Sequence, residues 1–430
     1  MEKDLTTGSV FKNIVFFSLP YLLSYFLQTL YGMADLFIIG QFNGVDSITA
    51  VSVGSQVMHM LTVMIVGLAM GATVTIGKAV GAKQSRQAAL TVGNTITLFM
   101  GVSVAVMVLL LVLVKPIVSV MSTPAEAVFE TVIYLTICFL GIPLITAYNM
   151  ISSIFRGLGD SKSPMYFIAV ACAANIVLDY LLIGVFRLGA AGAALGTTLS
   201  QTISVIVALA VIFKRKTGII LKKEDFKPQA EPMGQILKIG IPVALQDGFI
   251  QIAFIVITVI ANRRGLNDAA AVGIVEKIIG MVFLVPSTML STVSALSAQN
   301  IGAGKHDRAA ATLRYAVLMA AGFGMAVSVA LQFAGHGVVG MFTDETKVII
   351  LGTSTCGRIS GIVCLRAYIS ASADIFVLMV CREFRFFIMY CQLYWCAFPV
   401  RFWHQNILRI RFILWGLLRR EVRCCRCWCA

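Results

Sequence analysis

Charged side chains are scarce in this chain of 430 residues, in which Asp, Glu, Lys and Arg make up 13% and hydrophobic residues make up 59%. Soluble proteins carry about 25% charged residues, so the scarcity excludes a soluble globular protein. A sustained alternation of polar and apolar residues is also missing, which excludes a closed membrane barrel. The chain instead has apolar runs of about 20 residues, the length of a helix that crosses a bilayer. These features predict an all-α integral membrane protein.

Ten apolar runs are long enough to form secure transmembrane spans. We place six spans in the first half of the chain and four in the second half. The spans are residues 14–39, 51–76, 88–113, 127–153, 165–185 and 190–213, followed by residues 236–260, 270–297, 312–334 and 346–365.

The second half of the chain repeats features of the first half. Pro20, near the start of the first span, recurs as Pro242, 222 residues later, and each proline can bend its helix. The pair Gly81 and Ala82 recurs 221 residues later. Duplicated halves in a hydrophobic chain are typical of secondary transporters, whose substrate path lies between the halves.

The repeat predicts two lobes of six helices by design, related by a pseudo-two-fold axis along the membrane normal. We expect an N-lobe at residues 1–213, a cytoplasmic connector at 214–235 and a C-lobe at 236–364, followed by a tail at 365–430.

Basic residues gather in one set of loops and in the connector. Cytoplasmic loops of membrane proteins are enriched in Lys and Arg. We therefore place the N-terminus in the cytoplasm and the chain in the cell (inner) membrane. The basic loop residues are dispersed rather than gathered on one face, so they do not indicate a nucleic-acid partner. They include Lys12, Lys78, Lys83, Arg86, Arg156, Lys162, Lys305 and Arg308.

Residues 365–430 differ in composition from the rest of the chain. They contain all four Trp, seven of the eleven Cys and ten Arg, but one Gly, Gly416. A counterpart of the Gly-rich turn at residues 156–160, which the repeat predicts here, is missing. We interpret the tail as an aberrant C-terminus, with an altered reading frame as the hypothesis, so the second lobe is incomplete or altered. The Cys-rich end at 424–429 lacks the folded frame of a structural zinc site, and we expect no metal there.

A few polar residues lie inside the predicted N-lobe spans. An acid at membrane depth, such as Asp35, is costly to bury and marks a functional site, unless it lies at the wet outer end of its span. Asn175 and Asp179 are one helical turn apart and share a face. Thr197 follows Gly196 in the next span, where small residues allow a close helix approach. This approach predicts that the Thr197 hydroxyl reaches Asp179.

Two acids lie in the predicted C-lobe spans. Asp247 closely follows Pro242. Glu276 precedes Lys277, but adjacent residues on a helix do not face each other, so we expect no direct ion pair. Glu276 is therefore either neutralised by a nearby base or part of a C-lobe cation site.

Motifs of ATP-driven and catalytic sites are absent. The run from Gly71 to Lys78 looks like a phosphate-binding loop, but its spacing is one residue too long and Ala79 replaces the Ser or Thr that holds magnesium. No zinc-binding His-Glu-x-x-His helix and no Asp-rich magnesium cluster occurs. We expect no cofactor and no resident metal, and energy that comes from an ion gradient.

Several motifs in order resemble the multidrug and toxic compound extrusion (MATE) family over about residues 1–364. No single motif is specific, but their order and spacing together are. The matching stretches are Pro20 with Asp35 to Gly40, Gly67 to Gly71, Gly77 to Ala82, Phe155 to Pro164, Asn175 to Asp179 and Ala298 to Ala303.

The polar set is most similar to the DinF-type branch of this family. The resemblance implies that N-lobe acids bind the coupling cation and reset the drug site. It also implies that Gln28 and Asn149 line the same cavity. The implied coupling residues are Asp35, Asn175, Asp179 and Thr197.

The function that these features predict is a cation-coupled antiporter, driven by protons or sodium, that exports small amphipathic organic compounds by alternating access. We expect a monomer surrounded by membrane lipids. A lipid-linked sugar flippase of the same superfamily is an alternative, although no Lys or Arg falls inside the first six predicted spans. A non-functional frameshifted product and a membrane enzyme that uses Asp179 as an acid or base are the others.

Overall fold

The computed structural model describes residues 4–121, 123–214, 221–341 and 345–355. These residues form helices without a strand, which confirms the predicted all-α class. Helices suit the apolar runs because each backbone N–H and C=O group must be paired within its own segment at membrane depth. The long helices are α1 (Val10–Phe42), α2 (Val45–Gly81), α3 (Ser85–Val120), α4 (Val128–Leu140), α5 (Ile142–Gly157), α6 (Lys162–Asp179), α7 (Gly189–Lys214), α8 (Ala230–Arg264), α9 (Leu266–Gly302) and α10 (His306–Gly340).

Three short turns and a partial helix complete the described chain. The turns are η1 (Ala125–Ala127), the π-helical η2 (Tyr180–Val185) and η3 (Lys223–Phe226). Residues 346–355 are helical. The tail at 365–430, with its proposed defect, lies outside the described residues.

In the described part of the chain, eight helical segments are long and apolar enough to cross a membrane singly, and α4 with α5 adds a ninth as a bent pair. Nine predicted spans fall within these helices and are confirmed, while the tenth, 346–365, extends beyond the described residues. One prediction needs correction. Residues 127–153 are not one straight helix, because the chain bends by 47° at Gly141. Pro143 follows and lacks the N–H group that would continue the helical ladder.

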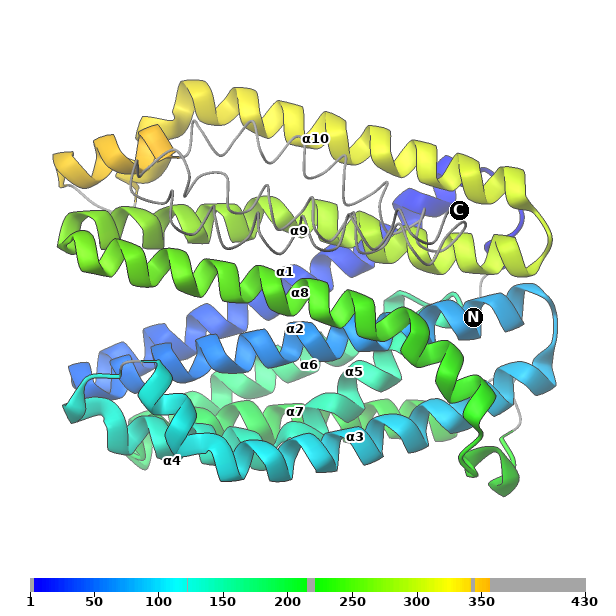
Figure 1. Ribbon diagram of the computed structural model, residues 1–430, viewed down its shortest axis with the longest axis horizontal. Helices are drawn as coiled ribbons and strands as arrows, with labels where there is room; N and C mark the ends of the chain where they lie inside the picture. Colours follow the sequence, from blue (N-terminus) through cyan, green and yellow to red (C-terminus); the bar gives the residue numbers. More distant parts are fainter. Residues whose placement is uncertain (1–3, 122, 215–220, 342–344, 356–430) are drawn as a thin grey trace, which may run out of the picture.

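The helices form two lobes that lie side by side (Figure 1). Among the described residues the N-lobe consists of α1–α7, and the C-lobe contains α8–α10 with the helical residues 346–355, so the two-lobe architecture predicted from the repeat is present. Helix α1 runs obliquely from one lobe to the other. It contacts α9 and α10 of the C-lobe as well as α2 and α6 of the N-lobe. The loops that join α2 to α3 and α9 to α10 lie with η3 at one end of the bundle, on the right in Figure 1. We term this end the connector end.

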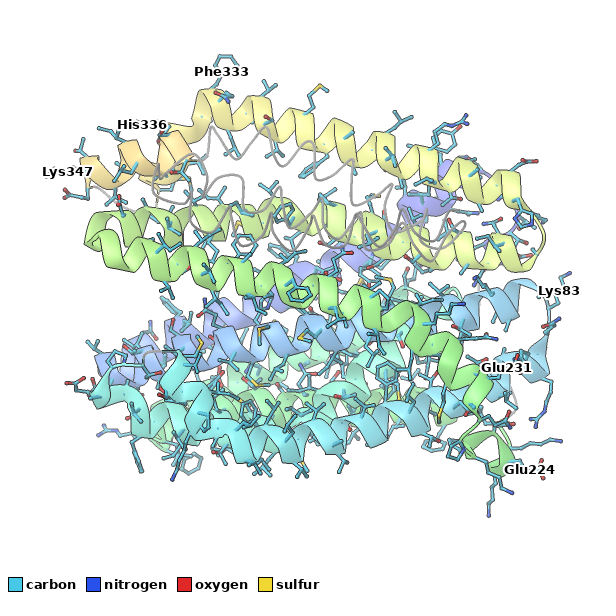
Figure 2. All side chains as sticks on the ribbon, viewed as in Figure 1. Lys83, Glu224, Glu231, Phe333, His336 and Lys347 are labelled. Carbon is cyan, nitrogen blue, oxygen red and sulfur yellow. The ribbon has the colours of Figure 1, made fainter. Side chains whose placement is uncertain are left out.

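Exposed charged side chains are found at both ends of the bundle (Figure 2). Lys83, Glu224 and Glu231 are at the connector end, and Lys347 is at the opposite end. The long sides instead expose large apolar side chains, such as Phe333, which is 88% exposed. This pattern fits a bundle that is surrounded by lipid and reaches water at both ends.

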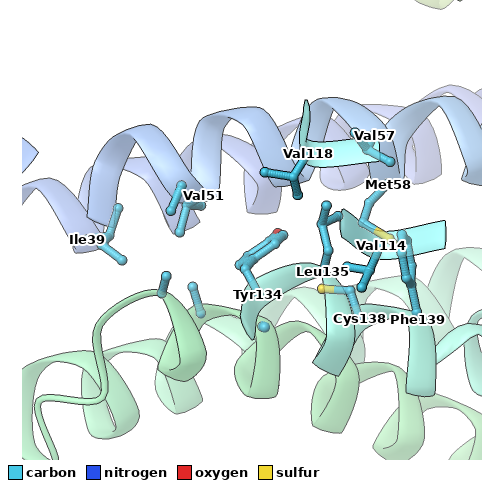
Figure 3. Close-up of a cluster of buried hydrophobic side chains, with 14 of the residues drawn as sticks. Ile39, Val51, Val57, Met58, Val114, Val118, Tyr134, Leu135, Cys138 and Phe139 are labelled. Carbon is cyan, nitrogen blue, oxygen red and sulfur yellow. The ribbon is translucent and has the colours of Figure 1, made fainter. Parts of the chain in front are cut away.

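Four buried hydrophobic clusters hold the described helices together, one of them between α9 and α10 within the C-lobe. The first lies within the N-lobe and packs Ile39 of α1 against Val51 of α2 and Tyr134 of α4 (Figure 3). A second lies mainly in the same lobe around Phe155 and includes Ile236 of α8. The third crosses between the lobes, because Phe17 of α1 packs with residues of α9 and α10. Helix α1 therefore begins in a core shared with the C-lobe and ends in the core of the N-lobe.

Glycines let α2 approach the C-lobe backbone closely. A Cβ atom at Gly71 would overlap the carbonyl oxygen of Ile236 in α8, and one at Gly81 would overlap the carbonyl oxygen of Gln299 in α9. Such positions admit glycine alone without movement of a backbone. Both contacts lie in the half of α2 that leads to the connector end, so the lobes meet tightly there.

We predict that Gly71→Ala lowers the apparent Tm of the purified protein, because the added methyl group overfills the contact at a cost of about 1–3 kcal/mol. Gly101→Ala on α3 is the matched control, since no atom lies within 4 Å of a Cβ there. Its better helix propensity should leave stability equal or raise it by up to about 1 kcal/mol. Heating followed by size-exclusion chromatography measures both values. Equal Tm values for the two variants would contradict the close approach.

Candidate functional site

The carboxyl group of Asp35 lies deep in the N-lobe. Asp35 belongs to the second half of α1, where this helix packs against α6 and α7. Its side chain is 5% exposed. The residue is therefore not a wet side chain at the end of its span, which was the alternative reading of the sequence.

Asn175 and Asp179 face Asp35 from the last turns of α6. Their side chains are 1% and 0% exposed, and the Asp35 carboxyl lies next to both. Because they are one turn apart, they share the face of α6 that packs on α1. The π-helical turn η2 begins directly after Asp179. Such turns interrupt a regular helix and are frequent at functional sites, and no sequence signal predicted this one.

Two glycines of α7 bring its backbone against this group. A Cβ atom at Gly196 would overlap Oδ1 of Asp179, so the carboxylate lies directly on the α7 backbone. A Cβ atom at Gly192 would lie 3.1 Å from the carbonyl oxygen of Leu182 in η2. The close helix approach expected from these small residues is confirmed.

Thr197 also joins the group, but its partner differs from the prediction. Its hydroxyl donates to Oδ2 of Asp35 over 3.3 Å. Neither carboxylate oxygen of Asp179 has a hydrogen-bond partner, so the expected contact from Thr197 to Asp179 is wrong. The hydroxyl points toward α1 because α7 packs Gly196, rather than Thr197, against Asp179.

Most polar atoms of this group are buried without a hydrogen-bond partner. They are Oδ1 of Asp35, both carboxylate oxygens of Asp179 and both amide atoms of Asn175. Among the described residues, no base forms an ion pair with either acid. Two adjacent buried carboxylates repel each other unless a proton or a cation lies between them. The group therefore has the oxygen atoms and the negative charge to hold a proton or a small hard cation.

Gln28 and Asn149 lie in the same lobe but outside this group. Gln28 interacts with the hydroxyl of Tyr148. Asn149 is buried, and its amide nitrogen donates to the carbonyl oxygen of Ile145 in its own helix over 2.9 Å. Gln28 is seven residues before Asp35 on α1, which corresponds to about 10 Å along the helix. Their predicted role in lining a cavity stays a prediction.

The two C-lobe acids lie on different helices. Asp247 of α8 lies against α2, since a Cβ atom at Gly67 would be 3.1 Å from its Oδ2. Glu276 of α9 is half-buried and accepts a hydrogen bond from Thr258 of α8 over 3.5 Å. Pro20 and Pro242 lie within α1 and α8, and both helices continue through them.

A small pocket between the lobes, lined by both polar and apolar side chains, was not predicted. Arg156, in the last turn of α5, holds its guanidinium carbon 4.8 Å from the centre of the Tyr21 ring, a cation–π contact. From the sequence we expected Arg156 in a loop, because the predicted span ends at residue 153, but α5 continues to Gly157. The pocket is lined by Tyr21, Val66, Met70, Thr73, Arg156 and Ser291.

The described residues form nine membrane-length segments in two lobes, with a buried carboxyl pair in one lobe, which is the arrangement of a multi-pass membrane protein. A family model described as MatE matches residues 20–181 and 242–365, and the chain therefore belongs to the MatE family. This match confirms the resemblance found in the motifs, and it ends where the tail begins. Assignment to the DinF-type branch stays a prediction.

Two relatives and one solved structure are similar to this chain over most of its length. Both relatives are from Bacillus subtilis (strain 168). The "Probable multidrug resistance protein YpnP" is 32% identical over 71% of this chain and 68% of the relative. The "Probable multidrug resistance protein YoeA" is 27% identical over 80% of this chain and 76% of the relative. A MOP superfamily transporter from Pyrococcus furiosus shares the fold, with a TM-score of 0.80 at 23% identity over 87% of this chain and 83% of its own.

We predict that Asp179→Asn raises the apparent Tm at alkaline pH in the absence of sodium, where the site holds no proton or cation. The change removes one of two repelling groups and lets an amide donate to Asp35, and an unsatisfied buried polar group costs about 1–3 kcal/mol. Asp225→Asn is the contrasting variant. Asp225 is fully buried and pairs with Arg86 over 2.6 Å, so its loss should lower the Tm, although the exposure of Arg86 moderates the effect. A fall in Tm for Asp179→Asn as large as that for Asp225→Asn would contradict the repulsion.

Proposed function

We propose that this chain is a cation-coupled exporter of amphipathic organic compounds, and that Asp35, Asn175, Asp179 and Thr197 form its coupling site. The observation that carries the proposal is the pair of adjacent carboxyl groups that are buried without a base. A fixed counter-charge would neutralise such a pair permanently, whereas an exchangeable cation neutralises it only while bound. The proposed cargo of the site is therefore a proton or a sodium ion.

Release of the cation would favour a change in the conformation of the protein. With the site empty, the two carboxylates repel each other across the contact of α1 with α6. Because α1 also packs in the core shared with α9 and α10, a shift of this helix would act on both lobes. Cation binding and substrate binding would then oppose each other by linkage, as an antiporter requires.

The proposed substrates follow from the relatives and from the lining of the lobes. YpnP and YoeA are named as probable multidrug resistance proteins. The interlobe pocket combines Met70 and Val66 with the aromatic ring of Tyr21. Flexible and aromatic apolar side chains suit compounds of varied shape. We propose that the connector end faces the cytoplasm, as the distribution of basic loop residues favours.

Because of Arg156, transport of a lipid-linked sugar, as by a flippase, is the second candidate function. Its guanidinium is the kind of group that binds a diphosphate. In this chain the guanidinium already lies over the Tyr21 ring. The transport assay therefore includes a lipid-linked diphosphate as a competitor, and we expect it to leave drug export unchanged.

The experiment that tests the proposal is ethidium transport into inside-out membrane vesicles, driven in turn by a proton and a sodium gradient. We predict that Asp35→Asn and Asp179→Asn each reduce gradient-driven transport to background while membrane expression persists. Asp46→Asn is the matched control, because Asp46 is an exposed acid in the first turn of α2, and its transport should be normal. Normal transport by both site variants would remove the coupling proposal.

The tail requires a second version of the same assay. We expect weak or absent transport from the chain as it stands, because an incomplete C-lobe cannot enclose the path. Replacement of the residues after 365 with the matching segment of YpnP should restore transport, and the site variants are compared in that background. Robust export by the unmodified chain would show that the tail is no defect.

A further inference from the structure

The C-lobe holds the segment that precedes α1 of the N-lobe. Lys305 Nζ donates to the carbonyl oxygen of Thr6 over 2.9 Å. Arg308 donates through its two terminal nitrogens to the carbonyl oxygens of Gly8 (2.9 Å) and Thr7 (3.2 Å). Both bases belong to the start of α10. We term this set of contacts the N-terminal clamp.

Neighbouring contacts fix the shape of the clamped segment. Leu5 is buried in the core that α1 shares with α9 and α10. The side-chain amide of Asn13 donates to the carbonyl oxygen of Thr7 over 2.8 Å. Hydrogen bonds from the Thr6 hydroxyl and backbone N–H, with the nearby charge of Lys305, hold the pKa of Asp4 below its usual range. The segment is therefore an ordered part of the connector end.

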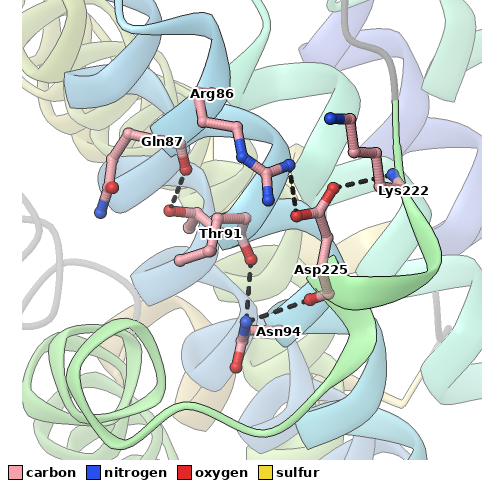
Figure 4. A network of polar contacts seen from close by, with 7 residues as sticks. Arg86, Gln87, Thr91, Asn94, Lys222 and Asp225 are labelled. Atoms are coloured by element: carbon pink, nitrogen blue, oxygen red, sulfur yellow. Dashed lines mark hydrogen bonds and ion pairs between the residues drawn. The ribbon is translucent and has the colours of Figure 1, made fainter.

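The N-lobe in turn holds the segment that precedes α8 of the C-lobe, through an ion pair and an asparagine (Figure 4). Arg86 pairs with the buried carboxylate of Asp225 over 2.6 Å. Asn94 donates to the carbonyl oxygen of Asp225 over 3.1 Å and accepts from the backbone N–H of Gln229 over 2.7 Å. Gln229 is the N-cap residue of α8. We term this set the connector clamp.

The connector clamp is closely packed as well as charged. A Cβ atom at Gly93 would overlap the backbone carbonyl of Asp225, so the turn η3 lies directly on α3. The hydroxyl of Thr97, one turn further along α3, donates to the carbonyl oxygen of Phe226 over 2.7 Å. Residues along the first half of α3 therefore hold the segment that precedes α8.

The arginines of the two clamps occupy equivalent positions in the internal repeat. Lys83 and Arg86 recur 222 residues later as Lys305 and Arg308. In each half, the arginine follows the second long helix and captures the segment before the first helix of the other half. A tether that merely anchored a loose end would need neither this reciprocity nor the matching position.

Tight contacts between the lobes surround both clamps. The side-chain amide of Gln299 in α9 donates to the carbonyl oxygen of Gly157 in α5 over 3.0 Å. A Cβ atom at Gly302 would overlap the carbonyl oxygen of Lys78 in α2. These contacts close the connector end, and the clamps lie at its rim.

We propose that the two clamps form a reciprocal lock that keeps the lobes together at the connector end, and that both clamps release when the lobes part there. The inference rests on the proposed function only for the expectation that the lobes part. The lock uses charge-assisted hydrogen bonds to backbone carbonyls and a buried carboxylate, which are strong and easily exchanged for water once exposed. Each lobe thereby holds the first helix of the other.

Hydrogen exchange of the full chain in lipid nanodiscs, followed by mass spectrometry, tests the lock without any transport. We expect Arg308→Gln to speed exchange of residues 4–13 by about tenfold, since charge-assisted hydrogen bonds are lost from this locally opening region. Because the lock is reciprocal, exchange should also rise in residues 221–229 and 295–302. Arg86→Gln should give the mirror-image result.

Arg314→Gln is the matched control, because Arg314 is an exposed base further along α10, and it should leave exchange unchanged. Residues 131–139 of the N-lobe core report on general unfolding and should stay protected in every variant. If a glutamine variant loses that protection, Arg308→Lys keeps the charge without the forked geometry and should give a smaller but shared increase. Increased exchange confined to the segment next to the altered arginine would overturn the lock and leave two independent tethers.

Discussion

Two carboxyl groups are buried next to each other in the N-lobe, and the packing of the surrounding helices is shaped by this constraint. Asp35 and Asp179 come from different helices, and neither has a base for a partner among the described residues. Gly196 has no side chain, and this leaves space for the Asp179 carboxylate. The π-helical turn η2 begins directly after Asp179. An uncompensated pair is costly in an apolar interior. Neutralisation by a proton or cation would remove this cost, in line with the proposed function.

Helix α1 connects this constraint with the rest of the molecule. Its first turns pack Ile14 and Phe17 into the core shared with α9 and α10, and its last turns pack Ile38 and Ile39 into the N-lobe core. Asp35 therefore lies on the one described helix that is built into both of these cores. The segment before α1 is in turn held by Arg308. Charge at the site and closure at the connector end thus act on the same helix.

The sequence predicted the helices and the members of the site, but not their exact partners. Apolar runs locate spans because a bilayer fixes their length, and the spacing of Asn175 and Asp179 fixes their common face. The break at Gly141 was not predicted, because a proline does not always interrupt a helix, as Pro20 in α1 and Pro242 in α8 show. The partner of Thr197 depends on the rotation of α7 about its axis, which the sequence does not show. Arg156 reaches the pocket because α5 continues for one more turn than predicted. The clamps join residues about 130 to 300 positions apart, and the repeat showed that Lys83 and Arg86 have counterparts without showing what they bind.

The central claim is that Asp35 and Asp179 act as one exchangeable site rather than as two separate acids. Infrared difference spectroscopy of the protein in lipid, recorded between acidic and alkaline pH, measures the protonated carboxyl group directly through its C=O stretch. Coupled acids titrate as a unit. The account predicts one buried carboxyl band that disappears or shifts in Asp35→Asn and equally in Asp179→Asn, and that sodium displaces if sodium competes for the site. Two independent bands, each lost in only one variant, would contradict it.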